Sequence, residues 1–185
     1  MRFSSLLIII FISLTISIKA ETNQKLIDSL EKGGKLIFIR HAYAPGSGDP
    51  ENFNLNDCST QRNLSQVGRI QARQIGNFIE KNKIPVDKVL SSEWCRCKET
   101  SSLAFQNFET KNFLNSFFSL KFFNNKDTQI SELKKYISKW DSDKNLVLVT
   151  HYVMISEVLD YAPSSGEIVI SDRDFKKIGS IEIKY

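Results

Sequence analysis

Two short apolar runs, each followed by a histidine, most constrain how this chain can fold. Residues 36–39 read LIFI and lead into Arg40-His41, and residues 146–149 read LVLV and lead into Thr150-His151. Short runs of this kind, bounded by polar residues, are typical of strands that are buried on both faces of a sheet. Each run therefore predicts a buried strand that carries one of the chain's two histidines at its carboxyl end.

Amphipathic segments alternate with apolar runs along the rest of the chain. Helices are expected at four places: residues 23–32, after Ser65, after Ser91-Ser92, and from Asp127 onward. Three more strands are expected, at residues 86–90, 168–170 and 178–183. Helices that alternate with strands imply a mostly parallel sheet with helices on both faces, so the sequence predicts an α/β fold, a three-layer sandwich.

Polar residues from three strands should meet at one edge of this sheet. In open sheets of this kind, ligands bind beyond the carboxyl ends of the strands. Arg40 and His41 follow the first strand, Arg96 lies shortly after the second, and His151 follows the last apolar run. A guanidinium offers a fork of donors that matches phosphate oxygens, and nearby cations disfavour protonation of an imidazole. We therefore predict an anion site that contains an unprotonated, nucleophilic imidazole.

The first twenty residues have the pattern of a secretory signal peptide. Arg2 gives a positive start, an apolar stretch runs from Leu6 to Ile18, and Ala20 is a small residue at the expected cleavage point. The alternative is a membrane anchor, but spanning a bilayer takes about 17 to 25 apolar residues, which is longer than this stretch. We expect a single domain over residues 21–185, periplasmic or secreted, that meets the membrane only through the signal peptide before its cleavage.

The charge of the chain points to no nucleic-acid partner. Lysine and arginine together number 25 against 21 aspartate and glutamate residues, and two of the basic residues, Arg2 and Lys19, lie in the predicted signal peptide. The remainder is nearly balanced and contains no basic stripe, which a nucleic-acid-binding surface would need.

The three cysteines, Cys58, Cys95 and Cys97, would meet an oxidising compartment after export. Cys95 and Cys97 are too close in sequence to pair easily with each other, so we predict a disulfide between Cys58 and one of them. A zinc site is the alternative, but the C-x-x-C spacing usual for such sites is missing. We expect no metal ion and no cofactor.

Four motifs resemble, in order and spacing, the signatures of the histidine phosphatase superfamily, which includes the phosphoglycerate mutases. They read FIRHAYAPG, CSTQRNLSQVGRIQA, VLSSEWCRCKETSSLAF and LVTHYVMIS, and they span about residues 36–155. The resemblance implies a three-layer α/β fold in which His41 attacks phosphorus, becomes a phosphohistidine and is then hydrolysed by water. It also implies three residues that hold the phosphoryl oxygens and stabilise charge in the transition state: Arg40, Arg96 and His151.

Arg62 is a further candidate for the phosphate site. It lies in the motif TQRNLS, three residues before Ser65, which is expected to cap a helix. From this position Arg62 either reaches the phosphate from the long loop over residues 42–63 or is an exposed arginine on that loop, and the sequence leaves both possibilities open.

The acid that protonates the leaving group is not apparent from the motifs. Many members of the family take a carboxylate from the segment after the third strand, but residues 110–126 contain no acidic residue. Three carboxylates lie near the motifs: Asp49, Asp57 and Glu93. We favour Asp49, because the loop after His41 could fold over the site, and an exposed turn residue is the competing interpretation.

Two functions remain open at this stage. The first is an exported, metal-independent phosphomonoesterase; export argues against a glycolytic mutase, and the resemblance allows a small-molecule or envelope-sugar phosphate ester as partner. The second is an exported phosphate-binding protein of the same fold, which the missing acid favours and the paired histidines disfavour. Other hydrolase designs lack their signatures, since the chain has no G-x-S-x-G elbow, no P-loop and no glycine-rich cradle between Cys58 and Arg62.

The segment NFLNSFFSLKFFNN, residues 112–125, has three possible interpretations. Its phenylalanines belong to the core, or they line a lid over the site that recognises an apolar or sugar part of the substrate, or they face a membrane together with nearby lysines. We predict core positions, because aromatic residues are mostly buried.

Overall fold

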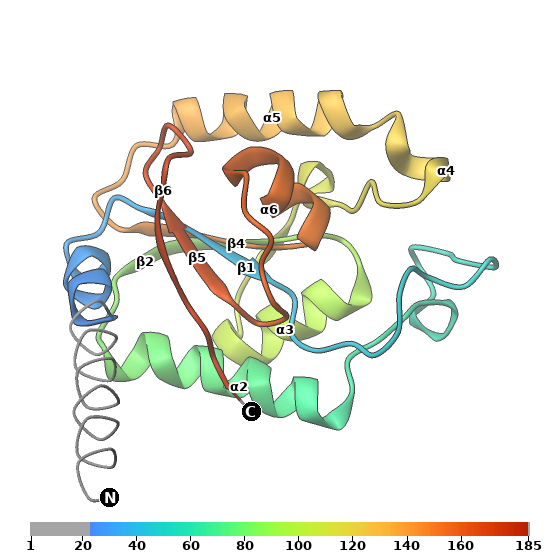
Figure 1. The fold of residues 1–185 in the computed structure, drawn as a ribbon, viewed down its shortest axis with the longest axis horizontal. Coiled ribbons are helices and arrows are strands. Elements are labelled where there is room, and N and C mark those ends of the chain that lie inside the picture. Colours follow the sequence, from blue (N-terminus) through green and yellow to red (C-terminus); the bar gives the residue numbers. More distant parts are fainter. Residues whose placement is uncertain (1–22, 185) are drawn as a thin grey trace, which may run out of the picture.

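A sheet with the strand order β3-β2-β4-β1-β5-β6 lies at the centre of the computed structural model, which describes residues 23–184 (Figure 1). The predicted signal peptide, residues 1–20, lies outside the described residues. The strands are β1 (Leu36–Arg40), β2 (Val86–Ser91), β3 (Glu109–Thr110), β4 (Asn145–Thr150), β5 (Ile168–Ser171) and β6 (Lys177–Ile181). Neighbours among β1 to β4 pair in parallel, whereas β5 is antiparallel to β1 and β6 is antiparallel to β5. The sheet is therefore mostly parallel, as predicted.

Helices cover both faces of the sheet and complete the three layers. They comprise residues 23–31, α2 (Gln66–Lys81), α3 (Cys95–Phe105), α4 (Leu120–Phe123), α5 (Lys126–Lys139), α6 (Tyr152–Leu159) and two short 3₁₀ helices, η1 (Cys58–Thr60) and η2 (Asn112–Leu114). In Figure 1, α2 and α3 lie on one face of the sheet, and α5 and α6 lie on the other. No helix among residues 23–184 is long and apolar enough to cross a membrane.

The apolar runs of β1 and β4 supply both halves of the core. Along β1, Ile37 and Ile39 pack into the cluster under α2 and α3, whereas Leu36 and Phe38 pack into the cluster under α5 and α6. Successive side chains of a strand point to opposite faces, so a strand between two helical layers must be apolar at every position. This is why the uninterrupted runs predicted the central strands correctly.

The start of α2 fixes the loop that follows β1. The side chain of Ser65 accepts a hydrogen bond from the backbone N–H of Gly68, which confirms Ser65 as the N-cap. A Cβ atom at Gly68 would lie 2.0 Å from the carbonyl oxygen of Tyr43, so only glycine permits this close approach. The beginning of α2 is therefore held against the residues that follow His41.

The phenylalanine-rich segment 112–125 divides between core and surface. Phe113 and Phe117 are buried, in agreement with the core prediction. Phe118 and Phe123 are 62% and 55% exposed, and Leu120 is 93% exposed, so the prediction is wrong for this part of the segment. The exposed part lies around α4, which projects from the body of the sheet in Figure 1.

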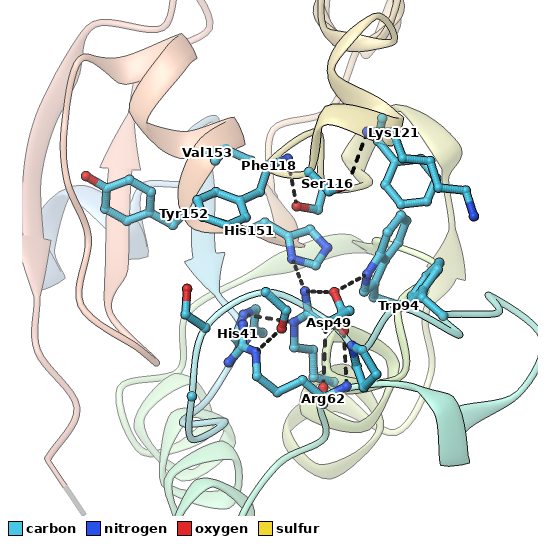
Figure 2. Close-up of a pocket in the computed structure, with 18 of the residues that line it drawn as sticks. His41, Asp49, Arg62, Trp94, Ser116, Phe118, Lys121, His151, Tyr152 and Val153 are labelled. Atoms are coloured by element: carbon cyan, nitrogen blue, oxygen red, sulfur yellow. Dashed lines mark hydrogen bonds and ion pairs between the residues drawn. The ribbon is translucent and has the colours of Figure 1, made fainter.

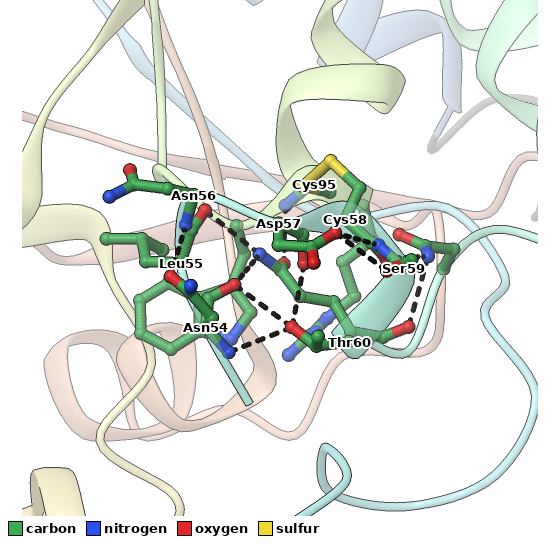
Figure 3. Close-up of a disulfide and its surroundings, with 12 residues drawn as sticks. Asn54, Leu55, Asn56, Asp57, Cys58, Ser59, Thr60 and Cys95 are labelled. Carbon is green, nitrogen blue, oxygen red and sulfur yellow. Dashed lines mark hydrogen bonds between the residues drawn. A yellow bond between two sulfur atoms is a disulfide. The ribbon is translucent and has the colours of Figure 1, made fainter. Parts of the chain in front are cut away.

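A disulfide joins Cys58 of η1 to Cys95, the first residue of α3 (Figure 3). Cys97 is a buried free thiol. The prediction that Cys58 pairs with Cys95 or Cys97 is therefore confirmed, and the partner is Cys95. The bond ties the long loop over residues 42–63 to the N-terminus of α3, directly beside Arg96. A cross-link across 37 residues restricts the unfolded chain and so favours the folded one.

Candidate active site

The site lies beyond the carboxyl ends of three parallel strands. His41 follows β1, His151 follows β4 and is the N-cap of α6, and Arg96 lies in the first turn of α3, after β2. The backbone N–H of His41 donates to the carbonyl oxygen of Thr150 at 2.9 Å, which keeps the ends of β1 and β4 together. These residues line a cavity of about 500 Å³, and Figure 2 shows His41, Asp49 and His151 within it.

His41 is held as a neutral ring whose Nε2 is unprotonated and accepts a hydrogen bond. Its Nδ1–H donates to the carbonyl oxygen of Ala42 at 2.8 Å, and its Nε2 accepts from Nε of Arg96 at 3.1 Å. Burial, and after it the positive charge of Arg96, hold the pKa of His41 well below the usual 6.5. Nε2 therefore carries a lone pair at neutral pH, as a nucleophile requires.

Arg96 is the hub of the site, and it is almost fully buried. Its Nη1 and Nη2 donate to the two carboxylate oxygens of Asp49 at 2.7 and 3.2 Å, and its Nε donates to His41. The remaining N–H groups reach Nδ1 of His151 and the carbonyl oxygen of Arg62, each at 3.4 Å. Every donor of this guanidinium thus has a partner. The carboxylate of Asp49 accepts from two of its nitrogens at once, which is also how a phosphate would bind to an arginine.

His151 is oriented by a chain of polar side chains. Because its Nδ1 accepts from Arg96, its Nε2 carries the proton, which it donates to Oγ of Ser92 at 2.8 Å. Ser92 donates in turn to Oδ1 of Asn115 at 3.0 Å, and Nδ2 of Asn115 donates to Glu93 at 2.6 Å. Burial, followed by the charge of Arg96, lowers the pKa of His151 well below 6.5. Sequence analysis missed Ser92 and Asn115; the only signal was the position of Ser92 after a predicted strand.

Cys97 lies beside His151 but is not suited to act as a nucleophile. Its sulfur is 3.5 Å from Nε2 of His151 and donates to the carbonyl oxygen of Thr150 at 3.7 Å. Burial raises the pKa of the Cys97 thiol to about 12. The thiol is therefore protonated at neutral pH and is a poor nucleophile.

Arg40 and Arg62 add positive charge at the edge of the cavity. Arg40 donates through Nη1 to the carbonyl oxygen of Pro163 at 2.8 Å, and its buried Nε has no hydrogen-bond partner within residues 23–184. Arg62 donates to the carbonyl oxygens of Gly48 and Ala44 at 2.8 and 2.5 Å. Arg62 is therefore a half-buried residue that folds the loop over the cavity, and the interpretation as an exposed loop arginine is wrong.

Asp49 is the one carboxylate of the three candidates that lines the cavity. Besides Arg96, it accepts from Nε1 of Trp94 at 3.1 Å and from the backbone N–H of Arg62 at 3.1 Å, and its side chain is only 16% exposed. The interpretation as an exposed turn residue is wrong. Asp57 instead caps η1 at the surface, and Glu93 holds Asn115. Within residues 23–184, no group of three or more His, Cys, Asp or Glu side chains could hold a metal ion.

Solved structures share this architecture at low sequence identity, whereas no family model and no curated protein sequence matches the chain. The protein histidine phosphatase SixA in complex with tungstate superposes with a TM-score of 0.53 at 13% identity, over 81% of this chain and 96% of that one. A candidate phosphohistidine phosphatase SixA from Agrobacterium tumefaciens gives 0.56 at 15% identity, over 80% and 98%. A candidate alpha-ribazole-5'-P phosphatase from Escherichia coli K-12 gives 0.60 at 15% identity, over 83% and 100%. The chain has the histidine phosphatase fold.

The histidine phosphatase fold of this chain buries two neutral imidazoles, and this makes its stability depend on pH. Unfolding returns His41 and His151 to water, where each takes up a proton below its ordinary pKa of 6.5. The unfolded chain then binds more protons than the folded one, so the free energy of unfolding falls as the pH falls. Between about pH 7.5 and 5.5 we expect a loss of about 1.4 kcal/mol for each histidine, measured by urea unfolding.

The matched control is the variant His41→Asn/His151→Asn, in which this dependence should largely disappear. Equal stability of the original chain at the two pH values would contradict the assignment of both imidazoles as buried and neutral.

Proposed function

We propose that the chain is an exported phosphomonoesterase that acts through a phosphohistidine at His41, without a metal ion. The observation that carries the proposal is the neutral His41, whose Nε2 lone pair lies in one cavity with Arg40, Arg62 and Arg96. The likeness to phosphatase structures supports it, and so does the tungstate of one of them, because tungstate is a tetrahedral oxyanion like phosphate.

In this mechanism the phosphate group first takes the place of Asp49 on Arg96. The guanidinium of Arg96 then binds two phosphoryl oxygens, and Arg40, Arg62 and His151 stabilise the remaining charge. Phosphoryl transfer depends mainly on such positioning and electrostatic stabilisation.

The transfer itself needs one nucleophile and one proton. Nε2 of His41 attacks phosphorus, the bond between phosphorus and the ester oxygen breaks, and its electron pair leaves with that oxygen. The ring gains positive charge, which the hydrogen bond from Nδ1–H to the carbonyl oxygen of Ala42 stabilises. Water then attacks the phosphohistidine, the bond between phosphorus and nitrogen breaks, and His41 returns to its neutral form.

Asp49 is the proposed proton donor for the leaving oxygen. Once a phosphate group holds the donors of Arg96, the carboxyl group of Asp49 is released from this ion pair and takes part in the reaction as the acid, in its protonated form. The protonated group then supplies the leaving oxygen, and its carboxylate later accepts the proton of the attacking water.

Replacing Asp49 with asparagine should therefore affect esters unequally. With an alkyl phosphate, whose alcohol leaves poorly without a proton, we expect kcat/KM, which reports the phosphoryl transfer and not the later hydrolysis of the phosphohistidine, to fall by about 10²-fold. With p-nitrophenyl phosphate, whose phenolate leaves unaided, the loss should be less than about fivefold. Steady-state rates on the two esters, with Asp57→Asn as the matched control, test this; equal losses on both would contradict the role of Asp49.

Export is part of the proposal. The signal-peptide pattern of residues 1–20 and the disulfide between Cys58 and Cys95 support it, because disulfides persist mainly in oxidising compartments. The partner would then be a small phosphate ester met outside the cytoplasm, with envelope sugars as one class to include in a panel of substrates.

The test is phosphate release from a panel of phosphomonoesters by the chain from residue 21 onward, with a chelator present. Alkaline quenching of these reactions should trap a phosphoryl group on the protein, and acid treatment should release it, as expected for phosphohistidine. Release that stops when the chelator is added would contradict the metal-independent mechanism. Phosphate binding without release from any ester would instead favour the non-catalytic binding protein of the same fold.

A further inference from the structure

The cavity is much larger than a phosphate group requires. Its volume of about 500 Å³ lies in the range of about 300–1,000 Å³ that is usual for pockets that enclose drug-sized molecules. The charged residues of the proposed mechanism occupy only one part of it. The remainder is available to the group that the phosphate is bonded to.

Four aromatic side chains form a second part of the lining, which we call the aromatic wall: Phe53, Trp94, Phe118 and Phe122. The rings of Phe53 and Trp94 are stacked, with centroids 5.0 Å apart. Phe122 meets both of them edge-on, at 5.6 and 5.5 Å. Phe53 comes from the loop after β1, Trp94 from the residue before α3 and Phe122 from α4. Phe118 lies between η2 and α4 and lines the same cavity without a ring contact to these three.

The wall begins at the reacting end of the cavity. Nε1 of Trp94 donates to Asp49 at 3.1 Å, and the Trp94 ring lies 5.4 Å from that of His151 (Figure 2). In the proposed function, Asp49 protonates the leaving oxygen. Because Trp94 holds Asp49 independently of Arg96, the group attached to that oxygen is placed on the side of Trp94, where it meets the aromatic wall.

The chemistry of the wall favours a flat apolar group over a polar one. Phe53, Phe118 and Phe122 have no polar atom, and the N–H of Trp94 is already used by Asp49. A sugar packed on these rings would gain no hydrogen bond from them, and its hydroxyl groups would depend on Ser116, Ser119 and Lys121, which also line the cavity. An aromatic ring gains both burial and ring-to-ring contacts.

We propose that the leaving group of the substrate carries an aromatic ring, which packs on the aromatic wall, so that the substrate class is the phosphate esters of aryl or aryl-bearing alcohols. This inference rests on the proposed function, because it uses the position of the leaving oxygen. It adds that Phe53, Phe118 and Phe122 determine the specificity of the cavity, whereas the arginines bind every phosphate ester alike.

Phosphonates test this without any dependence on the leaving group, because their carbon–phosphorus bond is not hydrolysed. Calorimetry with phenylphosphonate, cyclohexylphosphonate and methylphosphonate should give Kd values that rise in this order, with phenylphosphonate bound about tenfold more tightly than methylphosphonate. Inorganic phosphate, titrated in parallel, reports the charged residues alone.

In the variants Phe122→Leu and Phe118→Leu, phenylphosphonate should bind at most about threefold more tightly than methylphosphonate. Phe118 is 62% exposed, so its replacement leaves the fold intact even if Phe122→Leu disturbs it. Phe123→Leu is the matched control, because Phe123 is the neighbour of Phe122 on α4, is 55% exposed and does not line the cavity. This control should keep the ratio of the original chain.

The possible failures are distinguishable. Equal binding of the phenyl, cyclohexyl and methyl compounds, together with turnover of esters, would overturn the aromatic specificity and leave the proposed function standing. Tighter binding of cyclohexylphosphonate than of phenylphosphonate would also overturn it, in favour of a general apolar site. Absence of binding by inorganic phosphate and by all three phosphonates, with no ester hydrolysed, would overturn the proposed function itself.

Discussion

Replacement of His41 by alanine is expected to lower kcat for phosphate release by at least about 10⁴-fold, because removing a nucleophile leaves only binding and electrostatic stabilisation. The nearby thiol of Cys97 cannot replace it, because burial raises its pKa to about 12, and His151 is then the other imidazole of the cavity to be tested. Phosphate release under saturating ester, measured beside the original chain, gives the size of the loss.

A second measurement separates the nucleophile from a residue that only supports the site. The chain has two histidines, so a phosphohistidine trapped by alkaline quenching must belong to one of them. His41→Ala should trap no phosphoryl group, whereas His151→Ala should still trap one at a lower rate. The reverse result would assign the nucleophile to His151 and contradict the proposed mechanism. Near-ultraviolet circular dichroism of both variants controls for the fold.

The positions of His41 and His151 could be predicted from the sequence because each depends on a pattern of neighbouring residues, the apolar run before the histidine. Each histidine closely follows an apolar run whose residues face two helical layers, and the polar residues at both ends of the run mark where the buried strand begins and ends. The parallel pairing of β1 with β4 then brings the two rings to 5.5 Å. Strand order and the rule that ligands bind at carboxyl ends together locate the site.

The burial of Asp49 in the cavity could not be predicted from the residues near it in sequence. It lies in the segment GSGDP, whose composition is typical of an exposed turn, and nothing near it in sequence indicates a buried partner. Its partner Arg96 is 47 residues away. The loop is closed over the cavity by tertiary contacts, namely the hydrogen bonds of Arg62 to the loop carbonyls and the disulfide between Cys58 and Cys95. These contacts have no periodic pattern that a single sequence could reveal.

The burial of the phenylalanines in residues 112–125 also depends on tertiary contacts. Its rings follow neither a helical nor a strand period along residues 112–125, so the pattern does not say which of them are buried. Phe113 and Phe117 enter the core under α5, whereas Phe118 and Phe122 line the cavity. The core interpretation is thus correct for Phe113 and Phe117, whereas recognition of a substrate by Phe118 and Phe122 stays a prediction.

Replacement of Arg96 by lysine is expected to lower kcat/KM by about 10³-fold, although the charge is retained. Arg96 reaches His41, His151 and Asp49 with different nitrogens of one planar group, which a single ammonium nitrogen cannot do. The lysine would bind one phosphoryl oxygen as a point charge and would lose the fork that holds two. Steady-state kinetics with p-nitrophenyl phosphate, compared with direct binding of inorganic phosphate, separates the loss of binding from the loss of transition-state stabilisation.

Arg69→Lys is the matched control for this change, since Arg69 pairs with Glu99 at 2.6 Å on the surface of α2, outside the cavity. Surface ion pairs contribute at most about 1 kcal/mol, so kcat/KM should stay within about twofold of the original value. If Arg96→Lys behaves like this control, charge alone is enough to bind the phosphoryl group, and the forked contact of Arg96 has no part in the reaction. If it loses activity while still binding inorganic phosphate, the fork acts mainly on the transition state, which is where the proposed mechanism places it.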